Sequence, residues 1–292
     1  MTTWTRRRLS RAIGSAALAG LAARRTPAIA SPTRYHDHVL AKHPVGYWRF
    51  EESAGPVARD WTELGHNGTY QGGVTFGQAG AIRSERDKAV GLNGRDAFVL
   101  VPDSTAFSQP TSGRGLTVEA WFRPDTLTFP GQTSDPYVHW LGKGEAGAFE
   151  WGFRFYSLAS SDRPNRVSAY IWNPTSPPGE KNEGAGAYFQ DRLTAGKWIH
   201  VVACYDPGDA STPGAGVSIY KNGELRCSPA TSSGALYSNP RFDIHPRHGP
   251  APVRLGTRDL GSFLTGGLDE VAIYPRVLSA GEVLDNYRAA TY

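Results

Sequence analysis

Hydrophobic and polar residues alternate with a period of two in eight segments between residues 96 and 276. Because successive side chains of a strand point to opposite faces, this alternation predicts half-buried strands. The segments are Asp96–Pro102, Leu116–Pro124, Phe149–Leu158, Arg166–Pro174, Trp198–Tyr205, Val217–Gly223, Pro252–Thr257 and Leu268–Arg276. Between them we expect loops rich in Gly, Pro, Ser and Asp at 124–137, 173–187, 206–216 and 228–251.

Helical patterns are confined to the two ends of the folded part. A short helical turn is expected near His38–Lys42, and a helix is expected to begin after Ser279, with Glu282 completing a capping box. Asn222 and Gly223 mark a tight hairpin turn. With 34 glycines, 21 prolines and one methionine, the chain is turn-rich. The fold class predicted is all-β, in one domain over 31–292.

Residues 1–30 have the organisation of an export signal. Thr5–Leu9 (TRRRL) is basic, Ala12–Ala23 is weakly apolar, and Ala28–Ala30 forms a cleavage motif. The basic head resembles the twin-arginine motif, which directs export of folded proteins. We expect cleavage after Ala30 and a secreted protein, and no other segment is long and apolar enough to span a bilayer.

The net charge of +4 and the pI near 9.1 depend on this signal segment. Its six basic residues are Arg6, Arg7, Arg8, Arg11, Arg24 and Arg25. Removing these six from the 31 lysines and arginines leaves 25 basic residues against 27 acidic ones. The remainder has no basic run, so the sequence gives no indication of nucleic-acid binding.

Cys204 and Cys227 are the two cysteines, and an exported protein with an even number of cysteines can form a disulfide. If their strands flank Val217–Gly223 in a meander, they lie about 9–10 Å apart. A disulfide requires Cα atoms within about 7 Å. Pairing therefore stays open at this point.

Short motifs occur in a fixed order along nearly the whole chain after the signal segment. They are Val39–Ala41, Pro44–Glu52, Ala58–Asp60, Asn67–Tyr70, Gly77–Gly80, Ala89–Gly94, Val101–Pro102, Thr117–Phe122, Gly196–Val202, Tyr220–Gly223, Arg254–Gly256, Gly267–Tyr274, Arg276, Leu278–Ser279 and Glu282. In their order and spacing they resemble the laminin-G-like domains of the concanavalin A-like lectin and glucanase superfamily. The resemblance implies a jelly-roll β-sandwich of two antiparallel sheets, one of them concave, while function depends on the individual site.

The resemblance also implies a structural calcium ion between the first and last strands. Glu52, Asp60 and Asp269 occupy the matching positions, and calcium prefers such oxygen ligands. The alternative is that Glu52 and Asp269 are ordinary strand-end acids or hydrogen-bond caps for loops. A zinc or copper site is a weaker possibility because the histidines lack a closed spacing. These histidines are His36, His38, His43, His245 and His248.

The alternation also separates the aromatic residues of the middle segments into two faces. Trp151, Phe153 and Phe155 share one face, which we assign to the core. The other face carries aromatic, hydroxyl and guanidinium groups, which can stack on sugar rings and bond their hydroxyls. The residues predicted to bind a ligand there are Arg154, Tyr156, Ser168, Tyr170 and Trp172. Ordinary packing beneath the long loops is the alternative.

Catalysis has less support. Glu119 and Glu150 can form a carboxylate pair only if their separate strands face one groove, and no glucanase spacing is present. Arg154, Tyr156, His200 and Gln190 offer the residue types of a polysaccharide lyase, without its motifs. The sequence therefore favours a non-catalytic module that binds an extracellular polysaccharide or other glycan. The alternatives are a polysaccharide-degrading enzyme and a protein-adhesion domain.

Overall fold

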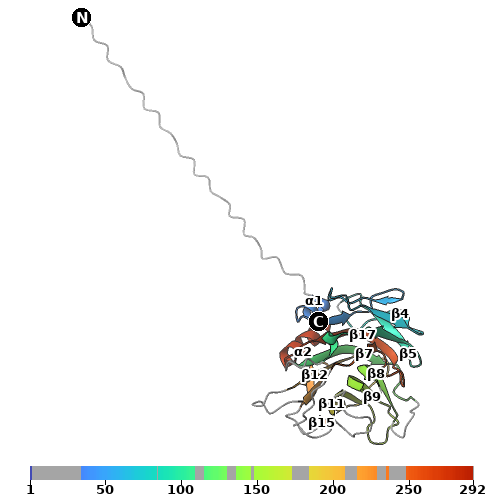
Figure 1. Cartoon of the computed structure of the whole chain (residues 1–292). Coiled ribbons are helices and arrows are strands. Elements are labelled where there is room, and N and C mark those ends of the chain that lie inside the picture. The colour runs from blue at the N-terminus through green and yellow to red at the C-terminus, as the bar shows by residue number, and fades with distance from the viewer. Residues whose placement is uncertain are drawn as a thin grey trace. The chain divides into compact units, whose positions relative to one another are not determined.

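Two antiparallel sheets pack face to face to form the folded part of the chain (Figure 1). The structure, a computed structural model, describes residues 1, 34–83, 85–108, 115–129, 136–145, 148–172, 184–207, 216–228, 235–236 and 248–291. The predicted signal peptide, apart from residue 1, lies outside the described residues, and Thr33–Tyr292 form a compact unit.

The first sheet has eight strands among the described residues. Its order is β14 (Glu224–Cys227), β13 (Gly216–Lys221), β12 (Ile199–Asp206), β7 (Leu116–Pro124), β17 (Thr265–Tyr274), β5 (Lys88–Asn93) and β4 (Thr75–Ala79), with β1 (Gly46–Trp48) also paired to β17. We call it the helix-covered sheet, because both helices pack on its outer face.

The second sheet has nine strands among the described residues. Its order is β15 (Ala235–Leu236), β11 (Gly184–Gln190), β10 (Arg166–Trp172), β9 (Ala148–Tyr156), β8 (Tyr137–Glu145), β16 (Val253–Leu255), β6 (Phe98–Val101), β3 (Gly68–Gln71) and β2 (Val57–Ala58). A short 3-10 helix, η1 (Thr105–Phe107), follows β6. We call this second sheet the nine-stranded sheet.

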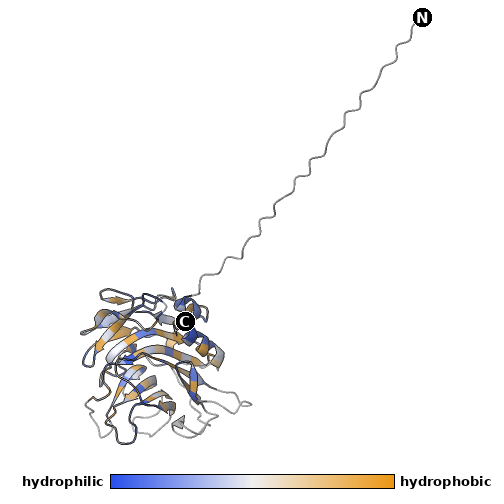
Figure 2. Cartoon of the chain, turned by 180° about the vertical axis from the view of Figure 1, so that it is seen from behind, coloured by the Kyte–Doolittle hydropathy of each residue, from blue (hydrophilic) through white to orange (hydrophobic). Residues whose placement is uncertain are grey.

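Each of the eight alternating segments forms a strand, and the predicted all-β jelly-roll sandwich is confirmed. The inward-facing residues of both sheets make the main core, including Trp151, Phe153 and Phe155 as expected. Figure 2 shows the cause, since hydrophobic and hydrophilic positions alternate along the strands. Burying one face of each strand is the main force that holds the sheets together.

The predicted meander of β12, β13 and β14 is also confirmed. Asn222 and Gly223 turn the chain with φ of 52° and 80°, the left-handed values that a two-residue hairpin requires. Cys204 packs on the outer face of this sheet and Cys227 in the core between the sheets. Because the two thiols lie on opposite faces of this sheet, they do not form a disulfide with each other.

Two helices cover the outer face of the helix-covered sheet. They are α1 (Tyr35–Leu40) and α2 (Ala280–Thr291), which pack with Trp121, Val202 and other residues in a second core. The predicted capping box is present at α2, where Ser279 Oγ accepts a hydrogen bond from Glu282 N and the Glu282 carboxylate accepts one from Ser279 N. In the described residues, no helix has the length and apolar character needed to cross a membrane.

Two of the loop predictions are wrong in part, and one of them is 228–251, because β15 lies inside that segment. β8 and β11 were not predicted, and β11 begins inside the segment expected to be a loop at 173–187. Glycine and alanine occupy four of the seven positions of β11, Gly184 to Ala187, so the alternation of large apolar residues is absent. Pairing with β10 along its whole length forms the strand instead.

A buried carboxylate joins both helices to the sheet beneath them. Glu119 Oε1 accepts a hydrogen bond from the hydroxyl of Tyr35 on α1 (3.0 Å). The same oxygen is hydrogen-bonded to Nε2 of His200 on β12 (2.7 Å). Glu119 Oε2 accepts from Tyr274 of β17 (2.7 Å) and from Asn286 of α2 (2.8 Å). We call this set the Glu119 network; its carboxylate is fully buried with both oxygens satisfied.

Replacing Glu119 with Ala is expected to lower the free energy of unfolding by about 3 kcal/mol or more, because the buried donors lose their acceptor. Urea denaturation measures this. Glu224→Ala on exposed β14 is the matched control, with an expected change below about 0.5 kcal/mol. Equal effects of the two substitutions would contradict the role of the network.

The network also predicts an acid dependence of stability. Burial opposes ionisation of Glu119, but the hydrogen bonds from His200, Tyr274 and Asn286 outweigh it and lower the pKa of Glu119. Its contribution is therefore present above the ordinary glutamate pKa and is lost as pH falls through the lower folded-state value. Unfolding curves between neutral pH and about pH 3 should show a smaller loss of stability in Glu119→Gln than in the unsubstituted protein.

Candidate functional site

The outer face of the nine-stranded sheet gathers guanidinium, imidazole, hydroxyl and aromatic groups. His139 of β8, Arg154 of β9 and Ser168 of β10 are paired across the three strands, so their side chains form one row. Tyr170 and Trp172 follow Ser168 on the same face, and their rings stack at 5.2 Å. We define the arginine face as the following residues: Tyr137, His139, Arg154, Tyr156, Ser168, Tyr170, Trp172 and Arg258.

Arg154 is the centre of the arginine face. Its Nε donates to His139 Nε2 (3.2 Å) and its Nη1 donates to the Tyr156 hydroxyl (3.0 Å). The guanidinium carbon also lies 4.2 Å from the ring centroid of Tyr137 and 4.8 Å from that of Tyr170. Such cation–π contacts stabilise a desolvated cation but do not neutralise it.

Charge on the arginine face shifts the pKa values of two neighbours. Burial lowers the pKa of His139, and the positive charges of Arg258 and Arg154 lower it further, so this imidazole is neutral near pH 7. Burial opposes ionisation of Tyr156, but Arg154 and Arg163 outweigh it and lower the pKa of its hydroxyl. Arg163 Nη1 donates to that hydroxyl at 3.1 Å.

Arg258 lies across β8 and β9 where both strands carry glycine. A Cβ atom at Gly142 would lie 2.8 Å from Arg258 Cγ, and one at Gly152 would lie 3.0 Å from Arg258 Cδ. The absence of side chains at these two positions makes room for Arg258. Its guanidinium carbon lies 3.6 Å from the ring centroid of Phe149 and 5.1 Å from that of Trp172.

Arg258 is only partly satisfied. Its Nη2 donates to Asp259 (2.8 Å), while its buried Nε and Nη1 have no hydrogen-bond partner. Burial lowers the pKa of Arg258 to about 10, and the neighbouring Asp259 carboxylate opposes that shift. Guanidinium donors without an acceptor are costly in a protein interior.

The structure brings together the five residues predicted to bind a ligand, Arg154, Tyr156, Ser168, Tyr170 and Trp172. The sequence analysis missed Tyr137, His139 and Arg258. The first two lie on β8, which was not predicted. Arg258 follows β16 and reaches the site through the glycine pair, which is a tertiary feature without a local sequence signal.

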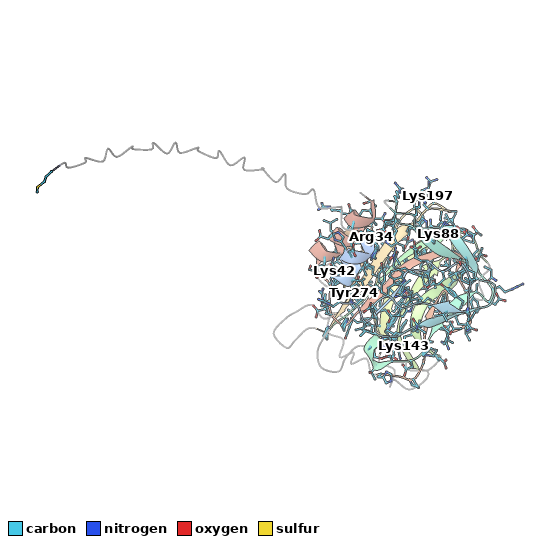
Figure 3. All side chains as sticks on the ribbon, turned by 90° about the horizontal axis from the view of Figure 1, so that it is seen from above. Arg34, Lys42, Lys88, Lys143, Lys197 and Tyr274 are labelled. Carbon is cyan, nitrogen blue, oxygen red and sulfur yellow. The ribbon has the colours of Figure 1, made fainter. Side chains whose placement is uncertain are left out.

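Glu119 and Glu150 lie on different sheets, so the condition for a carboxylate pair is not met. Glu119 lies beneath the helices in the Glu119 network, and Glu150 lies on the nine-stranded sheet. Glu150 is paired with buried Lys143 and accepts a hydrogen bond from Gly249 N (3.0 Å). Lys143 lies on β8 of the nine-stranded sheet, whereas Tyr274, a neighbour of Glu119, lies on β17 of the helix-covered sheet; both are labelled in Figure 3. Two such separated carboxylates cannot flank one glycosidic bond.

The four residue types considered for a lyase are also separated. His200 is buried in the Glu119 network on the helix-covered sheet, whereas Arg154 and Tyr156 lie on the nine-stranded sheet. Gln190 accepts hydrogen bonds from Arg166 at the end of β11. The imidazole beside Arg154 is that of His139.

A second group of charges lies at the seam of β1, β5 and β17. Carboxylate oxygens of Glu51, Asp87 and Glu270 lie within 4.8 Å of one another. Arg49 Nε donates to Glu270 (2.9 Å) and its Nη2 to Glu51 (3.0 Å). Burial raises the pKa of Glu270 to about 8 and that of Glu51 to about 7. We call Glu51, Asp87, Asp269 and Glu270 the acidic cluster.

Two oxygen atoms of the acidic cluster accept no hydrogen bond. Asp87 Oδ1 and Asp269 Oδ1 are buried without a hydrogen bond, although Asp269 Oδ2 accepts from Ala81 N (2.8 Å). Burial and the nearby Asp87 raise the pKa of Asp269 well above its ordinary value. Buried carboxylate oxygens of this kind fit the requirements of a calcium ion.

The other two expected calcium ligands do not join Asp269. Glu52 accepts hydrogen bonds from Arg59 N (2.9 Å) and the Tyr70 hydroxyl (2.6 Å). Asp60 accepts from several backbone amides, among them Tyr47 N (3.1 Å). These two acids therefore act as loop caps, which for Glu52 is the alternative stated above. The neighbouring Glu51 takes the place expected for Glu52.

The histidines form no metal-ligand group among the described residues. His36 packs against Trp61, and His248 pairs with Asp103 at 3.2 Å. His245 lies outside the described residues. Two cavities lined by described residues lie between the sheets and measure about 20 and 10 Å³, too small for a sugar ring.

A family model described as the concanavalin A-like lectin/glucanases superfamily matches residues 93–284. The chain belongs to this family. No curated protein sequence matches it. Membership of the concanavalin A-like superfamily agrees with the two-sheet architecture and with the ordered motifs.

Solved structures share this fold at low sequence identity. Domain 4 of AbnA, an extracellular arabinanase from Geobacillus stearothermophilus, in complex with arabinotriose, is 19% identical with a TM-score of 0.52, covering 84% of this chain and 98% of that one. The binding domain of botulinum neurotoxin DC in complex with SialylT is 11% identical with a TM-score of 0.57, covering 85% and 52%. This chain therefore spans about half the length of the toxin domain.

The charges around Tyr156 give a prediction that needs no ligand. We expect its hydroxyl to ionise below the ordinary tyrosine pKa of about 10. A difference titration by ultraviolet absorbance between the unsubstituted protein and Tyr156→Phe isolates this group. Arg163→Gln should move the titration to higher pH. A Tyr156 titration at or above the ordinary value would contradict the electrostatic assignment.

Proposed function

We propose that this protein is a secreted, non-catalytic module that binds an extracellular glycan through the arginine face. The observation that carries the proposal is the set of Arg154, Tyr170 and Trp172 on one face of adjacent strands. Aromatic rings stack on the apolar faces of sugars, while guanidinium and hydroxyl groups bond sugar hydroxyls in fixed directions.

The structural neighbours support this proposal by analogy. The AbnA domain is described in complex with arabinotriose, and the toxin domain in complex with SialylT. A related toxin domain is described in complex with rat synaptotagmin II, so this fold also serves protein recognition. Secretion is supported by the basic and weakly apolar segment over residues 1–30, with a twin-arginine-like motif.

Native affinity electrophoresis through gels that contain single polysaccharides tests the proposal. We expect retardation in at least one gel without loss of the polymer stain. Tyr170→Ala combined with Trp172→Ala should abolish the retardation, whereas Tyr287→Ala on α2, which lies on the opposite outer side, should not. Clearing of the polymer would indicate an enzyme, and unchanged mobility in every gel would favour a protein partner.

The acidic cluster supports a structural calcium ion as part of the same proposal. Glu51, Asp87, Asp269 and Glu270 would hold the ion, and its charge would compensate their mutual repulsion. Arg49 compensates only part of that negative charge.

Calcium added after chelation is expected to raise the melting temperature of the protein. Since Glu270→Gln removes one ligand charge, it should abolish most of this rise. The matched control Glu224→Gln, on exposed β14, should keep it. A melting temperature that does not respond to calcium in the unsubstituted protein would rule out the ion.

A further inference from the structure

We propose that the arginine face selects an anionic glycan, with Arg154 as the group that binds a carboxylate or sulfate on the polymer. This inference deepens the proposed function and rests on it. It concerns the chemical class of the glycan, which the aromatic residues alone do not determine.

Arg154 has no counter-charge among the described residues. No described aspartate or glutamate forms an ion pair with it, and its hydrogen bonds go to the His139 imidazole and the Tyr156 hydroxyl, neither of which is a carboxylate. Its contacts to Tyr137 and Tyr170 are also uncharged. A largely desolvated cation without an anion is costly, and a bound anion would compensate it.

Donors without a hydrogen-bond partner remain on the same face. Arg154 Nη2 has no hydrogen-bond partner among the described residues, and Arg154 itself is partly exposed. Ser168, which pairs with Arg154 across β9 and β10, has a buried hydroxyl without a partner. Nε and Nη1 of Arg258 are likewise buried without a hydrogen-bond partner. A planar guanidinium with free donors suits the two oxygens of a carboxylate or sulfate.

The acids near Arg154 form ion pairs with other cations. Asp259 pairs with Arg258 through one nitrogen, and Glu150 pairs with Lys143. Neither acid forms an ion pair with Arg154. Positive charge is therefore in excess at the centre of the arginine face.

This excess is local. The 25 basic and 27 acidic residues outside the first 30 make that part of the chain slightly acidic. Retention of an acidic domain by a polyanion cannot be explained by its overall charge. It would have to come from a specific site.

Affinity electrophoresis with four polymers tests the inference. Polygalacturonate presents carboxylates, dextran sulfate presents sulfate esters, and dextran and arabinan are neutral. We expect stronger retardation by an anionic polymer than by both neutral ones. Retardation by polygalacturonate alone assigns the carboxylate, by dextran sulfate alone the sulfate, and by both the shared anionic chemistry.

Variants locate the interaction. Arg154→Gln is expected to weaken retardation at least about tenfold in dissociation constant, since it removes a charged hydrogen-bond donor. Ser168→Ala and Arg258→Gln should weaken it by smaller factors, and they replace Arg154→Gln if thermal unfolding shows that this variant does not fold. The matched control Arg95→Gln removes the same charge from a residue whose side chain is 82% exposed, and should bind normally.

Two outcomes would overturn the inference, and they differ in what they leave standing. Binding to dextran or arabinan without binding to either polyanion would refute the anionic class but keep the proposed glycan-binding function. Equal loss in Arg154→Gln and Arg95→Gln would show that overall charge, and not the site, determines retention. Absence of binding to all four polymers would count against both proposals.

Discussion

The arrangement of this molecule depends on one buried carboxylate, Glu119, which accepts hydrogen bonds from both helices and from two strands of one sheet. Because a buried anion must be fully satisfied, the positions of Tyr35, Tyr274 and Asn286 are fixed relative to one another. The helices consequently cover the outer face of that sheet, which leaves the outer face of the nine-stranded sheet as the place for the candidate site.

The two outer faces differ in how far a charged side chain is compensated by its neighbours. Beneath the helices, the negative charge of Glu119 has a full set of donors from the chain itself. On the arginine face, the positive charge of Arg154 has no carboxylate among its described contacts. A satisfied buried charge stabilises the fold, whereas a charge left without a counter-ion is a feature typical of binding sites.

Much of the fold was predictable because alternation is a local property. It located β7, β9 and β10, and it placed Arg154, Tyr170 and Trp172 on one face. Alternation did not predict which outer face the helices cover. Glu119 and the strand residues of the arginine face occupy the same outward positions of a period-two pattern. β11 was missed because its small residues lack a pattern, and Arg258 because its path depends on glycines in other strands.

The position of α1 and α2 on the same sheet determines the side on which anything joined through them is attached. Both terminal helices lie on the outer side of the helix-covered sheet, away from the side chain of Arg154. Anything joined through α1 or α2, whether a further polypeptide, a cell surface or a solid support, is therefore attached behind the sandwich. The arginine face then lies on the side of the sandwich away from that attachment.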